Sequence, residues 1–452
     1  MSYTNLLHYR SMSVSEQYGI SGGGADAIAA SIESGVDAGA LVPGTQLPSV
    51  RALATDLGVS PTTVAAAYRA LRRRGVIVTH DRSRTTVASG PPFPARPSPP
   101  VPEGAIDLAS GNPDPALLPD LQAALADLAV PLRLYGDADM VPALAARARA
   151  WFEADGVVAQ HLAVVSGALD GIERVLSVQL RPGDRVAVED PAYASVLDLV
   201  RALGLVPVPA AIDIDGLLPD ALDRALGSGV AAVVVTPRAQ NPSSAAISVE
   251  RARALRSVLA RHPQVLIVED DHAGAVAGPD AVTLTAGRER FAVVRSFAKA
   301  LGPDLRVAVL AGDGATMNRV RGRQRTGHGW VSHLLQRLTL RLWETAAADG
   351  TLDCARDAYA ARRDAVVAAL SGRGVAAWGR SGLCVWIPVD AEGPVLQRLL
   401  AAGWVAQPGE LYRLASPPAI RLAVGGVPVA QAPALADAVA GAMYAPPRTR
   451  LG

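Results

Sequence analysis

The sequence predicts a two-part protein: a small helical domain that ends in a β-hairpin, followed by a larger α/β domain with a parallel sheet. The chain has 452 residues, which is too long for one ordinary hydrophobic core. Seven prolines fall between residues 89 and 102, and such a stretch forms a stiff, extended spacer. Beyond it, apolar β-branched runs alternate with helical stretches, which favours a parallel sheet covered on both faces.

The bulk composition indicates a globular protein with no overall affinity for nucleic acid or membrane. Half of the residues are apolar and the net charge is +1, so any preference for a charged partner must be local. The two cysteines, Cys354 and Cys384, form no disulfide or metal framework, which fits a reducing cytoplasm. No apolar run reaches about 18 residues, so we expect no transmembrane helix. The polar N-terminus has no signal core.

The first 90 residues have the element order of a winged helix-turn-helix. After a tail over 1–24, we expect helices over 25–34, 50–57 and 61–74 and strands over 76–79 and 85–87. Gly58 ends the second helix, and Ser60-Pro61 begins the third with an N-cap and a proline at the first helical position. Helix, short turn, helix and hairpin follow one another as in that motif, so we place this domain at 25–90 and a linker at 91–104.

A local excess of arginine points to DNA as the partner of this domain. Between residues 49 and 90, seven arginines face two aspartates, a net charge of +5, whereas the rest of the chain is near −4. Such a basic module is typical of phosphate contact, although the cluster 72–74 alone also suits a solvated helix end. The residues expected at the DNA are Arg51, Tyr68, Arg72, Arg73 and Arg74, with Ser60, Thr62 and Thr63 at the bases, and Arg82 and Arg84 on the wing.

Lys299 is the single lysine of the chain, whereas arginine supplies the other 42 basic residues. Arginine and lysine interchange where only surface charge matters, so a lysine that survives this bias marks a position that arginine does not fill. A desolvated primary amine loses its proton and forms a Schiff base with an aldehyde, which a guanidinium does not. The alternative is an ordinary surface lysine. Its place after an apolar run, three residues beyond Ser296 and seven before Arg306, favours the chemical role.

Polar residues follow several of the predicted strands of the large domain. The strands are expected over 162–165, 185–188, 231–235, 265–268, 292–294 and 307–310. Ligands of such sheets bind at the carboxyl ends of strands. There the chain has a small-residue turn at Gly167, Ala168 and Leu169, whose free N–H groups suit a phosphate, then Tyr193, Asn241 and Asp270. Each also has an ordinary explanation as core residue, turn or helix cap. Together with Lys299 they predict a pyridoxal phosphate site.

Two segments resemble known families. Residues 43–54 (PGTQLPSVRALA) and 57–71 (LGVSPTTVAAAYRAL) resemble the GntR-type DNA-binding domain. The region 105–452 resembles fold-type I aminotransferases, which consist of a large α/β domain that binds pyridoxal phosphate and a smaller C-terminal α+β domain. The linked pair is similar to the MocR regulators. This resemblance implies a head-to-tail homodimer.

The resemblance also implies roles for individual residues. Lys299 corresponds to the lysine that holds the cofactor aldehyde, and Asp270 to the acid that pairs with the pyridinium nitrogen. Asn241 and Tyr193 correspond to the residues that bond the ring hydroxyl and stack on the ring. Arg421 corresponds to the arginine that grips a substrate carboxylate. The phosphate would be held by Gly167, Ala168, Leu169, Ser296 and Arg306, with Tyr135 reaching the partner subunit's phosphate.

Three departures from the family pattern stand out. His272 replaces the usual tyrosine, and an imidazole has a charge that varies near neutrality. The sequence Asn241-Pro242-Ser243-Ser244 replaces Asn-Pro-Thr-Gly, and arginines replace glycines on the wing. The first two changes bear more on catalytic turnover than on cofactor binding.

The sequence favours a cytoplasmic transcriptional regulator that binds double-stranded operator DNA. Its large domain is expected to bind pyridoxal 5′-phosphate, with no metal, and to sense an amine, an amino acid or the vitamer itself. One alternative is an active aminotransferase with an accessory DNA-binding domain, although at most slow or half transamination is expected. A second is a dimerisation scaffold that binds no cofactor, against which the single lysine argues.

Overall fold

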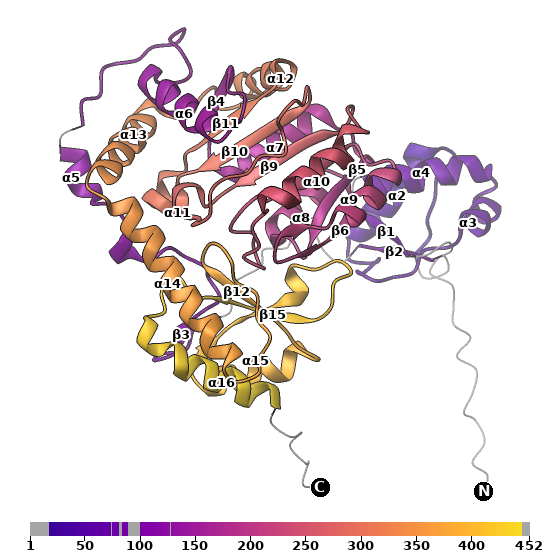
Figure 1. Ribbon diagram of the computed structural model, residues 1–452. Coiled ribbons are helices and arrows are strands. Elements are labelled where there is room, and N and C mark those ends of the chain that lie inside the picture. Colours follow the sequence, from indigo (N-terminus) through magenta and orange to yellow (C-terminus); the bar gives the residue numbers. More distant parts are fainter. Residues whose placement is uncertain (1–17, 74, 81–83, 89–99, 127, 445–452) are drawn as a thin grey trace, which may run out of the picture. The chain divides into compact units, whose positions relative to one another are not determined.

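The computed structural model describes residues 18–73, 75–80, 84–88, 100–126 and 128–444 (Figure 1). Arg74, Arg82 and most of the proline-rich linker, all named above, lie outside these residues. The chain divides into two compact units, one made chiefly of the first 96 residues and one that holds most of the remainder. They are described in turn.

The N-terminal unit is a winged helix-turn-helix, as predicted. Its helices are α2 (Ala25–Asp37), α3 (Val50–Leu57) and α4 (Pro61–Arg73), and an antiparallel hairpin follows, made of β1 (Ile77–His80) and β2 (Arg84–Val87). The Ser49 hydroxyl accepts a hydrogen bond from the Ala52 N–H at the start of α3. Gly58 ends the helix with a φ of 65°, a left-handed conformation that glycine adopts without strain.

Tyr68 belongs to the core of this unit, and the expectation that it contacts DNA is wrong. Its side chain is buried beside Ile28, Leu53 and Val64, and its hydroxyl donates a 2.8 Å hydrogen bond to the Pro48 carbonyl. Burial raises the pKa of the phenol well above its ordinary value. The residue lies on the face of α4 that packs against the other helices, as its spacing from Val64 and Leu71 requires.

The large unit is built on a mixed sheet, with eight strands in the described part of the chain. Their order is β4-β11-β10-β9-β8-β5-β6-β7. Neighbours from β10 to β6 run parallel, but β11 is antiparallel to both β10 and β4, and β7 is antiparallel to β6. The expected parallel sheet is thus present from β10 to β6, and the strands at its two edges run antiparallel. The bounds are β4 (His161–Val165), β5 (Arg185–Asp190), β6 (Val206–Asp213), β7 (Gly216–Leu217), β8 (Ala232–Val235), β9 (Leu266–Asp271), β10 (Phe291–Ser296) and β11 (Ala308–Gly312).

The central strands are buried along almost their whole length, because helices cover both faces of the sheet (Figure 1). This burial explains why the sequence shows continuous apolar runs there instead of alternation. The helices of this part are α5 (Leu121–Ala126), α6 (Pro142–Ala154), α7 (Ala168–Gln179), α8 (Ala194–Ala202), α9 (Pro219–Gly227), α10 (Val249–Ala260), α11 (Ala298–Leu301), α12 (Gly314–Arg325) and α13 (His333–Ala348).

A smaller lobe with its own core completes the unit. A three-stranded sheet of β12 (Cys384–Pro388), β15 (Ala419–Ala423) and β14 (Gln407–Pro408) packs with α14 (Thr351–Ser371), α15 (Glu392–Ala401) and α16 (Ala432–Tyr444). The lobe also takes in the start of the unit, because β3 (Ile106–Asp107) pairs with β13 (Trp404–Val405). None of the helices in the described part of the chain is long and apolar enough to cross a membrane.

A buried network of charges holds the end of β9 in place. Arg238 donates two hydrogen bonds to the carboxylate of Asp271, at 3.0 and 2.9 Å, and Arg295 lies 3.1 Å from the same group. Burial alone would raise the pKa of Asp271, but Arg238 and then Arg295 hold it below the ordinary value. The carboxylate is thus a fixed anion that joins β9 to β10 and to the loop after β8. The residues on either side of it, Asp270 and His272, are positioned by this network.

Candidate functional site

A cavity of about 230 Å³ opens where the central strands end and the small lobe begins. It gathers most of the residues that the sequence singled out, from segments far apart in the chain. Its lining includes Ala168, Leu169, Tyr193, Asn241, Asp270, His272, Ser296, Lys299, Arg306 and Arg421. The carboxyl ends of neighbouring parallel strands meet at one edge of a sheet, which is why these loops converge.

Lys299 enters the cavity from α11, the short helix after β10. Its ammonium donates a 2.6 Å hydrogen bond to the Gly111 carbonyl. Burial lowers the pKa of this amine; Cys384 opposes the shift and Arg421 adds to it. A lysine that loses its proton more readily than usual is a better nucleophile toward an aldehyde, so the site has the group that a Schiff base needs.

Asp270 holds a buried carboxylate with an unsatisfied oxygen. The residue is 3% exposed, and its Oδ1 has no hydrogen-bond partner among the described residues. Burial, and then repulsion from Asp271, raise the pKa of Asp270 to about 7. Buried polar groups in native proteins are nearly always paired, so this oxygen indicates a ligand with an N–H donor. A protonated pyridine nitrogen is such a donor, and its charge would stabilise the ionised carboxylate.

The opposite side of the cavity has the form of an anion cradle. Gly167 begins α7 with a φ of 99°, and a Cβ added there would lie 2.5 Å from Nη2 of Arg306. The positive φ favours glycine here, and Ala168 and Leu169 at the start of this 12-residue helix line the cavity, so the N-terminus of the helix lies beside it. Arg306 and Ser296 face the same space. The donors suit a phosphate, so both ends of the cavity fit pyridoxal phosphate.

Arg421 approaches from the small lobe, on β15. The side chain is 3% exposed and donates hydrogen bonds to the Ala109 carbonyl and, at 3.3 Å, to Oδ1 of Asn241. Its Nε has no partner among the described residues. A buried guanidinium in the lining of the cavity suits a carboxylate, and Asn241 is held beside it.

His272 is neutral at ordinary pH, which corrects the expectation that its charge varies near neutrality. Its Nε2 lies 2.8 Å from the Ala239 carbonyl, which only accepts, so this nitrogen carries the proton. Burial, and then the charge of Lys299, lower the pKa of the ring to about 4. Nδ1 of the neutral ring is consequently an acceptor, whereas the tyrosine usual in the family donates from this position.

Ser244 stands where the family has glycine, and its backbone takes the conformation that glycine favours. Its φ is 56°, a left-handed value that strains a residue with a side chain. Hydrogen bonds hold it there: its hydroxyl accepts from the Cys384 N–H at 3.1 Å, and its carbonyl accepts from the N–H groups of Arg380 and Ser381. The departure in sequence therefore preserves the path of the chain and ties the large lobe to the small one.

Tyr135 is not part of the cavity. It is 93% exposed, and its ring meets Trp330 edge to face with centroids 5.6 Å apart. Several other apolar side chains of this stretch are exposed with it, among them Leu132 at 87% and Leu134 at 67%. An exposed cluster of this kind is typical of a surface that a partner covers.

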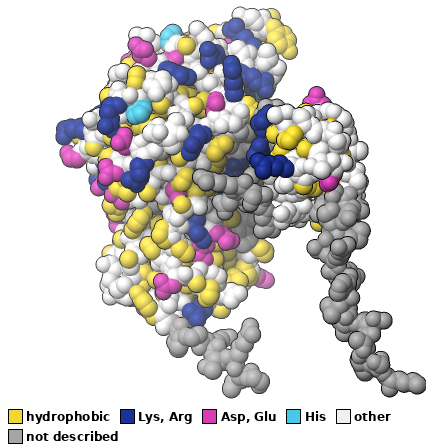
Figure 2. Space-filling model, turned by 90° about the vertical axis from the view of Figure 1, so that its right-hand side faces the viewer, with side chains coloured by type: hydrophobic (Ala, Val, Ile, Leu, Met, Phe, Trp, Pro, Cys, Tyr) yellow, Lys and Arg dark blue, Asp and Glu magenta, His cyan; other side chains and the backbone are white. Residues whose placement is uncertain are grey.

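In the N-terminal unit, the start of α4 presents polar groups to solvent. The Ser60 hydroxyl caps the helix by accepting from the Thr63 N–H, and lies within 2.8 Å of the hydroxyls of Thr62 and Thr63. Arg51 and Arg72 are exposed, and dark blue basic side chains gather along one side of this unit in Figure 2. Arg73 and Arg84 lie in α4 and β2.

Sequence reasoning missed the contribution of the small lobe and of the chain entering it. Ser110, Gly111, Leu383 and Cys384 all line the cavity. A turn signal at Ser110-Gly111-Asn112-Pro113 was available, but nothing in it pointed to the lysine 188 positions away that bonds the Gly111 carbonyl. Leu383 directly precedes the apolar strand β12, which begins at Cys384, and neither residue carries a chemical signal in the sequence.

Comparisons with known proteins agree with this geometry. Residues 103–439 match the family model "Aminotransferase class I and II", and residues 25–87 match "Bacterial regulatory proteins, gntR family". The vitamin B6 salvage pathway transcriptional repressor PtsJ of Salmonella typhimurium is 39% identical over 406 residues, which cover 88% of this chain and 93% of that protein. The HTH-type transcriptional regulator TauR of Rhodobacter capsulatus is 27% identical and covers 84% and 88%.

Solved structures show the same fold for the large unit. The kynurenine aminotransferase of Pyrococcus horikoshii superposes with a TM-score of 0.68 at 22% identity, over 75% of this chain and 91% of that one. Both parts of the chain and their order are thus accounted for. The chain belongs to the MocR-type transcriptional regulators, in which a GntR-family DNA-binding domain is joined to a domain of the class I and II aminotransferases.

Proposed function

We propose that this regulator binds its operator through the domain at 25–90 and that a small amine or amino acid controls this binding from the cavity of the domain at 105–452. The linker at 91–104 joins the two. The observation that carries the proposal is the convergence of Lys299 and the unpaired oxygen of Asp270 in one cavity of a chain that also has a winged helix.

Pyridoxal 5′-phosphate is the cofactor of this family, and we assign its contacts from the cavity. The cofactor supplies an aldehyde that condenses with amines and a ring that withdraws electrons. Lys299 would bind the aldehyde, and Asp270 would keep the ring nitrogen protonated. Of the other residues that line the cavity, Tyr193 would cover one face of the ring, and Asn241 and His272 would lie at its hydroxyl. The phosphate is held by Gly167, Ala168, Leu169, Ser296 and Arg306.

The side chain of Arg421 indicates the chemical class of the effector. Its guanidinium lines the cavity where an amine would meet the cofactor bound to Lys299, so a ligand with both an amine and a carboxylate would use both groups. A simple amine, or the vitamer itself, uses only one of them. Amino acids are thus the effectors that the cavity would hold most tightly.

The second candidate function is that of an active aminotransferase. The residues in the cavity that would hold the cofactor favour it. Against efficient turnover stands His272, whose neutral ring presents an acceptor where the family's tyrosine donates. A sensor gains from a ligand that stays bound, because the bound state must persist long enough to shift the DNA-bound population.

We also propose that the protein acts in the cytoplasm as a head-to-tail homodimer. The exposed apolar side chains near Tyr135 support this assembly, since a partner subunit would cover them. Tyr135 would then reach the phosphate in the partner's cavity, which is consistent with its distance from the cavity of its own chain.

Steady-state assays would separate the sensor from the enzyme. We expect an amino acid to change operator affinity in a gel-shift titration, with no catalytic cycle beyond one half-reaction when a 2-oxo acid is added. The reason is the altered donor pattern at His272. Multiple turnover at the typical enzyme rate of about 10 per second, measured by formation of the new amino acid, would favour the aminotransferase.

Lys299→Arg should abolish covalent cofactor attachment and leave the fold intact, because charge and most of the side-chain stem remain while the amine is lost. The visible absorbance of the bound cofactor should disappear, and circular dichroism should match the wild type. In the wild-type protein, borohydride reduction should label one lysyl peptide. Retention of the visible band in the variant would contradict the assignment.

The absorbance of the bound cofactor should not follow a titration of His272 between pH 6 and 8. A ring with a pKa of about 4 stays neutral throughout that range, and its charged form appears only as the pH falls toward that value. Wild type and His272→Tyr should therefore show the same pH profile there, even if their band positions differ. A step near pH 6.5 in the wild type that His272→Tyr lacks would show that the ring is charged.

Arg51→Ala should weaken binding to operator and random DNA alike, because a phosphate contact carries no sequence information. The slope of log K against log salt should flatten by about one unit, as expected for one lost phosphate contact. Arg356→Ala, on α14, is a matched control and should change neither quantity. Loss of discrimination at a single base pair would make Arg51 a base-reading residue.

A further inference from the structure

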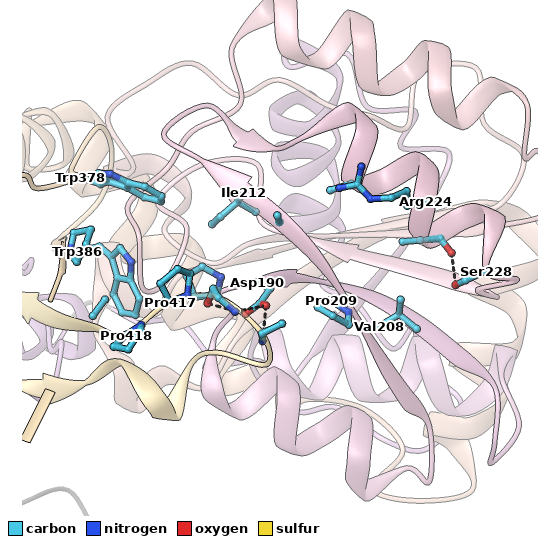
Figure 3. Close-up of a pocket in the computed structure, with 18 of the residues that line it drawn as sticks. Asp190, Val208, Pro209, Ile212, Arg224, Ser228, Trp378, Trp386, Pro417 and Pro418 are labelled. Carbon is cyan, nitrogen blue, oxygen red and sulfur yellow. Dashed lines mark hydrogen bonds between the residues drawn. The ribbon is translucent and has the colours of Figure 1, made fainter. Parts of the chain in front are cut away.

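A second and larger cavity lies outside the cofactor site. It has a volume of about 550 Å³ and lies between the edge of the large sheet and the small lobe. Figure 3 shows Trp378, Trp386, Pro417 and Pro418 at one end of it and Arg224 at the other, with the side chains of β6 between them. This volume is within the range of about 300–1,000 Å³ in which proteins bind small molecules.

The walls of this cavity are mostly apolar. Trp386 is 3% exposed, and its backbone exchanges hydrogen bonds with that of Trp378, so the two indoles are presented by a rigid pair of segments. Val208 and Ile212 continue the apolar surface along β6. Flat aromatic and proline surfaces of this kind bind an aryl group or an alkyl chain.

The charged groups of the cavity leave it with an excess of positive charge. Arg224 and Arg185 line it, and within the described part of the chain neither guanidinium has an ion pair or a side-chain hydrogen bond. The one carboxylate in the lining, Asp190, accepts four hydrogen bonds, from the N–H groups of residues 414–416 and the Ser416 hydroxyl, at 2.8 to 3.0 Å. The Asp190 carboxylate is thus occupied by residues 414–416, and an anionic ligand would meet the guanidinium groups of Arg185 and Arg224.

We propose that this cavity is a second ligand site, for an elongated carboxylic acid with an aryl end. The aryl group packs between Trp378, Trp386 and the two prolines, and the carboxylate pairs with Arg224 at the far end. An apolar body with one terminal anion is the chemistry that matches both ends at once, because a neutral molecule leaves the guanidinium unpaired and a small anion leaves the indoles uncovered.

The same strands line both cavities, so a ligand in the second cavity contacts elements that also form the cofactor cavity. On β12, Trp386 lines the second cavity and Cys384, two residues before it, lines the cofactor cavity. On β15, Ala419 lines the second cavity and Arg421, two residues after it, lines the cofactor cavity. Side chains two apart on a strand share a face. Asp190 likewise precedes Tyr193 by three residues. A ligand that fixes these elements therefore bears on the position of Arg421.

Calorimetry with 6-phenylhexanoate tests the proposal on the full-length, cofactor-loaded protein. The acid should bind about tenfold more tightly than 6-phenylhexan-1-ol, the difference that one charged hydrogen bond makes. Arg224→Gln should remove that preference. Arg253→Gln, an exposed arginine on α10 outside the cavity, is the matched control and should retain it. Visible absorbance confirms that each variant holds its cofactor.

Arg421→Gln distinguishes this site from the cofactor cavity, where a carboxylate also has a partner. Binding of 6-phenylhexanoate that survives in Arg421→Gln and weakens in Arg224→Gln supports the proposal. Binding lost in Arg421→Gln but unchanged in Arg224→Gln places the acid in the cofactor cavity and overturns it. Equal affinity for acid and alcohol, or no binding of either at millimolar concentration, overturns it as well.

Discussion

The site is organised around the buried carboxylate of Asp270, one oxygen of which has no hydrogen-bond partner among the described residues. Asp270 sits at the end of a strand whose neighbours are apolar, and the adjacent Asp271 is fully engaged by two arginines. The two acids therefore have different roles. Asp271 holds the end of the strand in place, and Asp270 remains available to a ligand. Burying an ionised carboxylate with an unsatisfied oxygen is unfavourable, and a cationic donor in the cavity would offset that cost.

Much of the site was predictable because its chemistry depends on residue types that have no easy substitute. A single lysine among 42 arginines, an acid after an apolar strand and an amide before a proline are visible in one sequence. Their convergence also followed, since parallel strands deliver their ends to one edge. The winged helix was similarly legible, because Ser49, Gly58 and Ser60 act locally as caps.

What the sequence did not reveal is contact that depends on the third dimension. The direction of β11 depends on the path of the chain that connects it to β10. An apolar run of five residues does not indicate whether a strand is parallel or antiparallel to its neighbours. Tyr68 shares a helix face with Val64 and Leu71, so its spacing agreed with a core position, but the extent of its burial became clear only from the packed helices. The neutral state of His272 depends on a carbonyl 33 positions away and on the nearby amine of Lys299, neither of which periodicity reports.

The pairing of β3 with β13 has a mechanical consequence. The chain that emerges from the DNA-binding domain is clamped first to the small lobe, through Ile106 and Trp404, before it enters the large sheet. The small lobe, which carries Arg421, is therefore also the part of the large unit to which the chain from the DNA-binding domain is first attached. A rotation of that lobe would carry Ile106 with it, and would therefore displace the point from which the chain leads back to the DNA-binding domain.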